Sequence, residues 1–372
     1  MLKKITPANS FGTDEFSELV AFAIQARGIG APLSGYLAGN AFAGTAVRQL
    51  EEAWSNVFSV KHSIAVNSAT SGLLAAAFAS DLKAGDRFLC PAMTMSATAA
   101  ATCFTGATPM FGDVMDDDFA LNNVRADWDV QAIVVTNLFG HPARLESLRR
   151  IADEMKVPLI EDNAQSPFAM EHGRYAGTIG HIGVFSLNVH KPLQCGEGGM
   201  ICTNDDDLAA RVRAFINHGE HVSERIGLNL RMPELCAVVA LSQLQRGPSI
   251  INRRVEQAEA IIEAIGFIPG LRQPVVRQGC THVYYTIPFL IDRSRRAFCD
   301  VLRAEGVPIV EQYAQPVYYL PALQKYQMHC QVAEDLYHKR LFYIENCAWD
   351  FTPKQIKQIG AAFKRAAEFV KL

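Results

Sequence analysis

Short runs rich in Val and Ile alternate with segments typical of helices through the first two-thirds of the chain. The β-type runs are 62–67, 87–90, 108–114, 131–137, 157–162, 182–187 and 199–203. The segments between them that favour helices include 45–58, 71–80, 97–106 and 144–155. Continuous apolar strands separated by helices are typical of a mostly parallel sheet buried on both faces. We therefore expect an α/β fold with helices on both faces of the sheet and with ligands at the carboxyl ends of strands.

The pattern changes near Pro233, after which two long helices are expected up to about Ile265, separated at Pro248 because proline interrupts a helix. A strand over 282–292, a helix over 294–305, an irregular aromatic stretch over 313–319 and two closing helices follow. A length of 372 residues allows two domains. We expect a large α/β domain over 1–250 and a smaller C-terminal α+β domain over 251–372.

Charge and composition exclude several classes of function. The formal net charge is -3 and no Lys/Arg run is present, which argues against a nucleic-acid partner. The apolar runs are shorter than the ~20 residues of a membrane span, and the two lysines near the N-terminus precede no apolar core of the kind a secretory signal has. The nine cysteines are scattered without a CxxC pair, which indicates a reduced, cytoplasmic protein without a metal site.

Three motifs at expected strand ends carry the chemistry. In the first, VPLIEDNAQS, the strand delivers Asp162 at its carboxyl end after three apolar residues. A half-buried carboxylate needs a partner, and a protonated pyridine nitrogen of pyridoxal phosphate is one candidate. A structural aspartate that caps a turn is the alternative, and this motif alone does not decide between them.

The second motif, VFSLNVHKPLQCGEGGM, places Lys191 in a loop between Ser186 and a glycine-rich turn at 196–199. A lysine in a confined pocket has a lowered pKa and can form an imine. The alternative is a surface lysine before a glycine turn. The neighbouring His190 is interpreted as a packing or hydrogen-bonding residue.

The third motif, VNSATSGLLAAAF, ends a strand at Asn67 and begins an alanine-rich helix near Ser71. Free N–H groups at a helix N-terminus, with the hydroxyls of Ser68 and Thr70, favour an anion such as phosphate. Ordinary N-capping is the alternative. A phosphate cradle, a carboxylate and a lysine at the strand ends of one sheet are what holding pyridoxal phosphate requires.

Together the motifs resemble the sugar aminotransferases of the DegT/StrS type, which are fold type I pyridoxal-phosphate enzymes. The resemblance rests on NSATSG (67–72), EDNAQS (161–166), the segments 177–205 and 227–244, and their order, and it extends from about Gly35 to the C-terminus. It implies that Lys191 forms the imine with the cofactor and moves the proton. It also implies that Asp162 pairs with the ring nitrogen and that Gln165 lies near the ring hydroxyl.

The same resemblance implies how the phosphate is held. Ser186 would bind it together with the Ala69–Thr70 backbone and the Thr70 side chain. Asn229 would reach the phosphate of the neighbouring subunit in a homodimer, with Arg231 beside it at the interface or at the substrate. Met95 stands where an aromatic ring often stacks on the cofactor in the family.

The acceptor site is expected at Tyr313, Tyr318 and Tyr319, because aromatic faces suit a sugar or cyclitol ring. Domain packing by these tyrosines is the alternative. The segment EQYAQPVYYLPAL (311–323) replaces a His-Tyr…Pro-x-His stretch common in members that use nucleotide sugars.

The sequence thus predicts an aminotransferase that moves an amino group from L-glutamate or glutamine to a keto-sugar, nucleotide-activated in the first instance, in amino-sugar biosynthesis. A cyclitol ketone or a keto-sugar without a nucleotide is the alternative acceptor. A sugar dehydratase of the same family is a further alternative, although such enzymes have histidine in the place of Lys191. The last alternative is a non-catalytic regulator that retained the fold.

Overall fold

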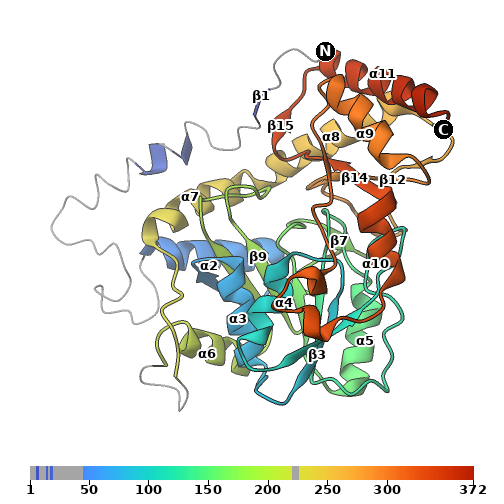
Figure 1. Ribbon diagram of the computed structural model, residues 1–372. Coiled ribbons are helices and arrows are strands. Elements are labelled where there is room, and N and C mark those ends of the chain that lie inside the picture. Colours follow the sequence, from blue (N-terminus) through green and yellow to red (C-terminus); the bar gives the residue numbers. More distant parts are fainter. Residues whose placement is uncertain (1–5, 8–13, 16, 20–44, 220–225) are drawn as a thin grey trace.

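The computed structural model describes residues 6–7, 14–15, 17–19, 45–219 and 226–372, and two main sheets organise them (Figure 1). Within these residues the larger sheet has seven strands in the order β2-β10-β9-β6-β5-β3-β4. Their bounds are β2 His62–Val66, β3 Arg87–Pro91, β4 Thr108–Gly112, β5 Ala132–Thr136, β6 Leu159–Asp162, β9 Ile182–Ser186 and β10 Gly199–Thr203. The strands from β9 to β4 are parallel, whereas β10 runs antiparallel to both of its neighbours. The expected mostly parallel sheet is confirmed.

Helices cover both faces of this sheet, as expected. On one face the core unites the alternate strand residues Ile64 and Val66 with α3, α4 and α6, and on the other Ala65 packs with α2 and α7. The bounds of these helices are α2 Thr45–Phe58, α3 Ala69–Ala79, α4 Ser96–Cys103, α6 Asp206–Phe215 and α7 Glu234–Gln245. Helix α5 (Leu145–Met155) covers the same face as α2, over β3, β5 and β6. Both faces are apolar because successive side chains of a strand point to opposite sides.

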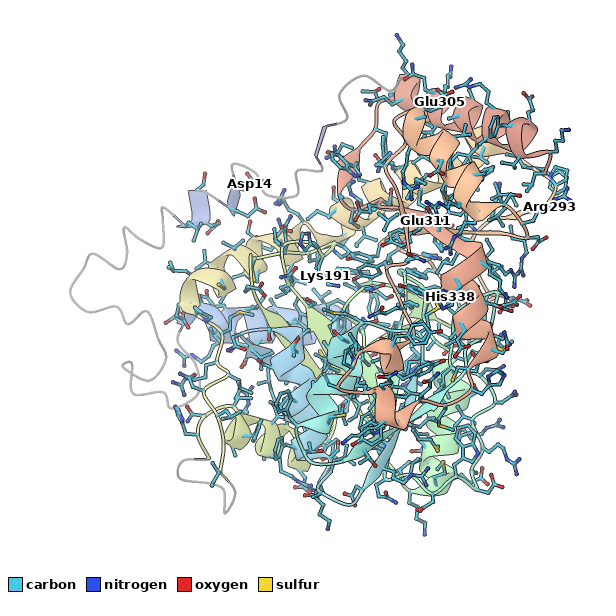
Figure 2. All side chains as sticks on the ribbon, viewed as in Figure 1. Asp14, Lys191, Arg293, Glu305, Glu311 and His338 are labelled. Carbon is cyan, nitrogen blue, oxygen red and sulfur yellow. The ribbon has the colours of Figure 1, made fainter. Side chains whose placement is uncertain are left out.

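The later part of the chain forms the expected smaller α+β unit, seen at the upper right of Figure 1. Its antiparallel sheet has the order β11-β12-β14-β13. The strands are β11 Leu271–Arg272, β12 Ile287–Ile291, β13 Ile309–Glu311 and β14 Leu341–Ile344, and the helices packed with them are α8 Gly247–Ile265, α9 Arg295–Ala304 and α11 Pro353–Val370. Arg293 and Glu305 lie on the outside of this unit, whereas Lys191 lies in the interior of the molecule (Figure 2).

One expectation for this region was wrong, and another was incomplete. The strand expected over 282–292 begins only at Ile287, because Tyr284 has φ +50 and the amides of Val283 and Thr286 donate to the carbonyls of Gly140 and Phe139. The two closing helices are α10 (Gln331–Asp335) and α11, but the strands β14 and β15 (Trp349–Asp350) lie between them. In both cases pairing with distant chain segments overrides the local pattern.

The boundary expected at 250/251 falls inside α8, and the division into two domains stays a prediction. The segment from Ala314 to Leu336 returns to the core of the larger sheet, where Val317 and Tyr318 are buried. No helix among the described residues is long and apolar enough to cross a membrane.

Candidate active site

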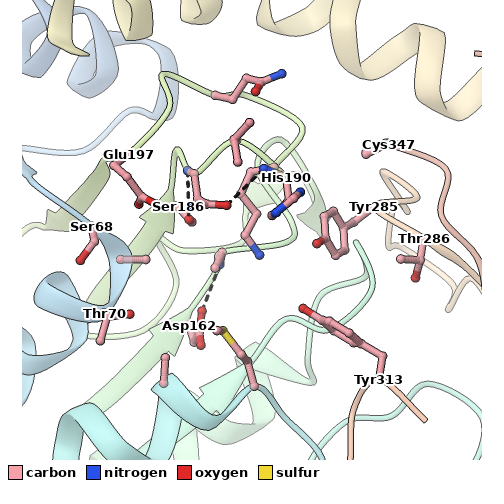
Figure 3. Close-up of a pocket in the computed structure, with 18 of the residues that line it drawn as sticks. Ser68, Thr70, Asp162, Ser186, His190, Glu197, Tyr285, Thr286, Tyr313 and Cys347 are labelled. Atoms are coloured by element: carbon pink, nitrogen blue, oxygen red, sulfur yellow. Dashed lines mark hydrogen bonds between the residues drawn. The ribbon is translucent and has the colours of Figure 1, made fainter. Parts of the chain in front are cut away.

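A cavity of about 710 Å³ lies at the carboxyl ends of β6 and β9. One side is formed by Asp162 and Ser186 at the ends of two strands of the larger sheet, by Lys191 in the loop after β9 and by the first residues of α3. The opposite side comes from three separate segments that carry Tyr285, Tyr313 and Glu345, and Figure 3 shows the two tyrosines across the cavity from Asp162. The cavity therefore forms where ligands gather in a parallel sheet, and distant parts of the chain close it.

Adjacent carboxylates at the end of β6 face opposite ways. Glu161 is fully buried and accepts the amides of Gly177 at 2.6 Å and Ile179 at 2.8 Å. Asp162 lines the cavity and accepts the hydroxyl of Thr98 at 2.6 Å. The alternation of a strand explains the division: Glu161 holds the loop after it, and Asp162 is presented to a ligand.

Burial raises the pKa of Asp162, and the hydrogen bonds from Thr98 and the Ala164 amide, with the charge of Lys191, offset this only in part. A buried carboxylate with a raised pKa is stabilised by any cation that enters beside it. A protonated ring nitrogen fits this requirement. Thr98 was missed by the sequence reasoning; its only signal is the Thr94/Thr98 spacing on an alanine-rich helix start.

The loop that carries Lys191 is closed by backbone hydrogen bonds between its two ends. Leu187 N donates to Gly198 O and Val189 N to Gly196 O, each at 2.9 Å. The side chain of Asn188 also donates to Glu197 at 2.7 Å. Because β9 and β10 are antiparallel neighbours, this connection is short and held at both ends, and it fixes the direction of the lysine.

The surroundings of the Lys191 amine change its pKa. Burial lowers its pKa, while the charges of Asp162 and Cys347 raise it to a smaller extent. Its Nζ lies 4.8 Å from the centroid of the Tyr285 ring. A lowered pKa increases the neutral fraction of the amine, which is the form that attacks a carbonyl. The expectation of a confined lysine agrees with this geometry.

The anion end of the cavity lies at the start of α3. Ser68 caps the helix by accepting the amide of Ser71 at 3.1 Å, so the capping alternative is realised at this residue. Ala69, Thr70 and Ser186 line the cavity beside it. The amides of Ala69 and Thr70 at the helix start and the helix dipole favour a phosphate there. A Cβ on Gly199 would lie 2.8 Å from the Ala69 nitrogen, so the close approach of β10 to this turn requires glycine.

Met95 and Tyr313 also line the cavity, while the structure places Gln165, Asn229 and Arg231 outside its wall. Gln165 is buried and accepts the amide of Phe139 at 2.7 Å. Asn229 is exposed, and Arg231 donates to the side chain of Asn217. The latter two residues therefore do not line the cavity of their own chain.

Tyr318 and Tyr319 lie away from the cavity. Tyr318 is fully buried, packs on Phe111 and donates to Glu334 at 2.8 Å. The hydroxyl of Tyr319 lies 3.0 Å from His338. These contacts match the packing interpretation of the two tyrosines.

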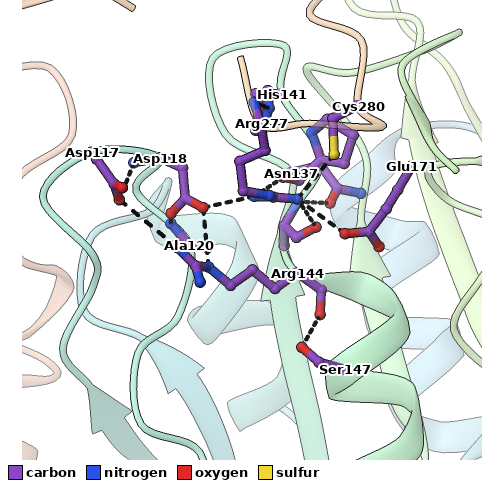
Figure 4. A network of polar contacts seen from close by, with 12 residues as sticks. Asp117, Asp118, Ala120, Asn137, His141, Arg144, Ser147, Glu171, Arg277 and Cys280 are labelled. Atoms are coloured by element: carbon purple, nitrogen blue, oxygen red, sulfur yellow. Dashed lines mark hydrogen bonds and ion pairs between the residues drawn. The ribbon is translucent and has the colours of Figure 1, made fainter. Parts of the chain in front are cut away.

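The sequence reasoning missed Tyr285, Thr286, Glu345 and Cys347, which form much of the far wall. An ion-pair network holds the segment that leads to two of them (Figure 4). Arg277 donates to Asp118 at 2.7 Å, to Glu171 at 3.1 Å and to two backbone carbonyls of the loop after β5. Burial alone would raise the pKa of Asp118, but the bonds from Arg277 and the Ala120 amide outweigh it and hold that pKa below its ordinary value.

Gly140 completes this attachment. It has φ +107, and a Cβ there would lie 2.7 Å from the backbone nitrogens of both Tyr284 and Tyr285. Its carbonyl accepts the amide of Val283 at 2.8 Å. Only glycine allows this contact, and the contact brings Tyr285 over Lys191.

The solved structures that share this fold define the class of protein. The chain superposes on an aminotransferase from Psychrobacter cryohalolentis with a TM-score of 0.87 and 26% identity, over 99% of this chain and 100% of the other. Residues 36–364 match the model of the DegT/DnrJ/EryC1/StrS aminotransferase family. The chain belongs to this family and is an aminotransferase, which confirms the resemblance.

Two relatives are sugar-modifying enzymes by name. The chain is 29% identical to the GDP-perosamine synthase of Escherichia coli O157:H7 over 309 residues, 79% of this chain and 83% of that protein. It is 30% identical to the UDP-N-acetyl-3-dehydro-alpha-D-glucosamine 3-aminotransferase of Acidithiobacillus ferrooxidans over 304 residues, 78% of this chain and 80% of the relative. Aminotransferases of this family are generally dependent on pyridoxal phosphate.

Proposed function

We propose that the chain binds pyridoxal 5′-phosphate in this cavity and transfers an amino group from L-glutamate or glutamine to a keto-sugar in the cytoplasm. The observation that carries the proposal is the presence of Lys191, Asp162 and the α3 N-terminus on one side of one cavity. Each suits a different end of the cofactor. The names of the two relatives support a nucleotide-activated sugar as the acceptor in amino-sugar biosynthesis.

The residues on the cavity wall fit the ring nitrogen, the aldehyde and the phosphate of the cofactor. Asp162 would receive the ring nitrogen, and Lys191 would receive the aldehyde. Ala69, Thr70 and Ser186 would hold the phosphate, with Ser68 fixing the helix start. Met95 would lie against the ring face, where a thioether packs on aromatic surface. Gln165 lies outside the cavity wall and accepts the Phe139 amide, so its place beside the ring hydroxyl is proposed from the resemblance alone.

When bound, pyridoxal phosphate supplies an electron sink for the negative charge that develops at the carbon bearing nitrogen. The chain supplies the rest. Lys191 Nζ takes the proton from the amino donor and returns a proton to the new carbon–nitrogen centre, and its lowered pKa suits it to both directions. The Asp162 carboxylate, oriented by Thr98 and the Ala164 amide, would stabilise the charge on the ring nitrogen.

We also propose a homodimer with shared active sites. Asn229 and Arg231 lie in the stretch before α7 and outside the cavity of their own chain. Asn229 would donate to the phosphate bound by the partner, and Arg231 would stand beside it. A two-fold interface makes the exchange reciprocal.

Cyclitol ketones and keto-sugars without a nucleotide are the second class of acceptor, favoured by the unusual segment 311–323, in which Tyr313 lines the cavity and Tyr318 does not. Lys191, on the cavity wall, supports transamination over dehydration and over a regulator without catalysis.

The test has two steps. The purified protein, supplied with pyridoxal phosphate, is mixed with L-glutamate or L-glutamine, and a change in visible absorbance is expected. Nucleotide keto-sugars, free keto-sugars and inososes are then added, and amination of one class is expected to restore the spectrum. No spectral change with any amino donor would contradict the aminotransferase proposal for this cavity.

A further inference from the structure

We propose that Thr286 and Glu345 together bind the side-chain amide of the amino donor, which makes L-glutamine rather than L-glutamate the donor for this protein. The inference rests on the proposed function, which leaves the two donors open. Both donors carry the same α-amino and α-carboxylate groups. Selection between them therefore depends on the distal group, which is an uncharged amide in glutamine and a carboxylate in glutamate.

Thr286 and Glu345 stand opposite one another at the end of two paired strands. The terminal pair of the ladder between β12 and β14 is Ile287 with Ile344. Continuing this antiparallel register by one step pairs position 286 with position 345. Neighbouring side chains of a strand point to opposite faces, and the two isoleucines are fully buried in the core of the smaller unit. The side chains of Thr286 and Glu345 accordingly belong to the other face, and both residues line the cavity.

The hydroxyl group of Thr286 has no partner in the described part of the chain. Thr286 is 4% exposed, and its Oγ1 atom is buried without a hydrogen bond. A buried hydroxyl without a partner is destabilising, so its place on the far wall of a cavity indicates a group that a ligand satisfies (Figure 3). Since no bond holds the hydroxyl, rotation to another staggered position breaks none.

Glu345 carries a carboxylate that is also available to a ligand. It is half-buried and lines the cavity. Among the residues that the structure describes, no hydrogen bond or ion pair engages it. The described wall includes no arginine, and its basic side chains are Lys191, which receives the cofactor, and the exposed His190. A second carboxylate beside Glu345 would therefore meet a like charge with no guanidinium to offset it.

The pair complements a primary amide better than a carboxylate. An ionised carboxylate only accepts hydrogen bonds, whereas a hydroxyl donates one and also accepts. The amide of glutamine offers its NH2 group to Glu345 and its carbonyl oxygen to the Thr286 hydroxyl, so both are satisfied at once. The carboxylate of glutamate accepts from Thr286 but repels Glu345. The wall therefore favours the uncharged distal group.

The pair lies at a place suited to the distal end of a donor whose α-amino group is at Lys191. Tyr285 directly precedes Thr286, and the centroid of its ring lies 4.8 Å from Lys191 Nζ. Figure 3 shows this ring between His190, the neighbour of Lys191, and Thr286. The two methylene groups of glutamine separate its amide from the α-carbon, which matches a subsite set back from the amine.

The experiment compares the parent protein with Glu345→Gln and Thr286→Val, and with Glu256→Gln, which changes an exposed carboxylate outside the cavity. Stopped-flow absorbance gives the second-order rate constant of the first half-reaction with L-glutamine and with L-glutamate. Calorimetry gives the Kd of the 2-methyl analogues of both amino acids, which lack the α-proton and bind without being converted. Thermal unfolding of each protein is measured without any amino acid.

We expect the parent to react at least ~10-fold faster with L-glutamine than with L-glutamate and to bind the analogues in the same order, because bonds to charged groups are stronger. Glu345→Gln should lower this preference at least ~5-fold, in part by a faster reaction with glutamate. Thr286→Val should slow the reaction with glutamine about 2- to 10-fold. Glu256→Gln should keep the preference of the parent.

The thermal midpoint separates a binding role of Thr286 from a structural one. Thr286→Val should keep or raise the midpoint, because it removes a buried hydroxyl that has no partner in the described structure. A lower midpoint or an unchanged rate with glutamine would remove Thr286 from the subsite.

Equal rates with the two donors, or a preference of the parent for glutamate, would overturn the inference. A preference for glutamine that survives undiminished in Glu345→Gln would do the same. The proposed function fails by a different result, in which neither amino acid changes the spectrum of the parent.

Discussion

Glu161 and Asp162 are consecutive residues of β6, yet their carboxylates lie on opposite faces of the sheet. Glu161 accepts amides of the loop at 177–180, and Asp162 accepts Thr98 and lines the cavity. Glu161 therefore has a structural function, and Asp162 is available to a ligand.

Replacement of Asp162 by Asn should leave folding intact and slow the glutamate half-reaction. A neutral amide cannot keep the cofactor ring nitrogen charged, and the loss of one charge-assisted hydrogen bond of about 1.5–3 kcal/mol slows the step about 10- to 100-fold. Stopped-flow absorbance measures the rate.

Glu161→Gln is the matched control. The new side-chain NH2 group would face backbone amides that also donate, so it would be buried without an acceptor. An unsatisfied buried group costs ~1–3 kcal/mol of the free energy of unfolding, which should lower the thermal midpoint by several degrees. The rate per folded molecule should stay near that of the parent. Near-normal rates in Asp162→Asn would show that this carboxylate is structural.

Lys191 should be the lysine that binds the cofactor covalently. The purified protein should be yellow, and borohydride reduction followed by peptide mapping should place the label on Lys191. Lys191→Ala should lose the label and transamination, whereas Lys339→Ala, an exposed lysine paired with Asp335, should retain both. A label on any other lysine would contradict the assignment of Lys191 as the lysine that binds the cofactor.

Shared active sites predict recovery of activity in mixed dimers. Two variants are prepared, Lys191→Ala and an inactivating replacement of Asn229. Equal amounts of the two are mixed and allowed to exchange subunits. If Asn229 serves the partner, each mixed dimer has one site with both defects and one with neither. Random exchange makes about half of the dimers mixed, so activity should rise to about a quarter of the parent value.

Mass spectrometry confirms the exchange in this experiment. If Asn229 served its own subunit, every site in the mixture would carry one defect and no activity would return. Exchange without recovery would therefore exclude the reciprocal arrangement.

Stability should fall in mild acid because of His141. Burial, followed by the charge of Arg277, lowers the pKa of His141 to about 4. The unfolded chain, with a histidine pKa of about 6.5, binds more protons between these values, so stability is lost as the pH falls through this window. From about pH 7.5 to about pH 5 the loss from this residue is about 2 kcal/mol.

Urea unfolding at the two pH values measures this loss. His141→Gln, which keeps an acceptor for the Arg277 amide, should have a shallower pH dependence. Some dependence should remain, because burial also lowers the pKa of His282 well below its ordinary value. Equal slopes in the parent and the variant would show that the pKa of His141 is the same in the folded and the unfolded protein, which would contradict the lowered pKa.

The sequence by itself determined the sheet class and the cofactor side of the cavity. Asp162, Ser186 and the α3 turn are each delivered by a strand and the residues next to it, so local patterns suffice to find them. The parallel order of the strands then brings their ends to one edge.

Only the tertiary structure decided the rest of the site. Thr98 reaches Asp162 across 64 residues. Tyr285 reaches the cavity because Gly140 and the Arg277 network bind the segment 277–286 to the larger sheet, and Tyr313 and Glu345 reach the same cavity from two other segments. Tyr318, by contrast, turns into the core. Such placements depend on contacts between segments that are distant in the sequence. The periodicity within one segment does not indicate which other segment its side chains will contact.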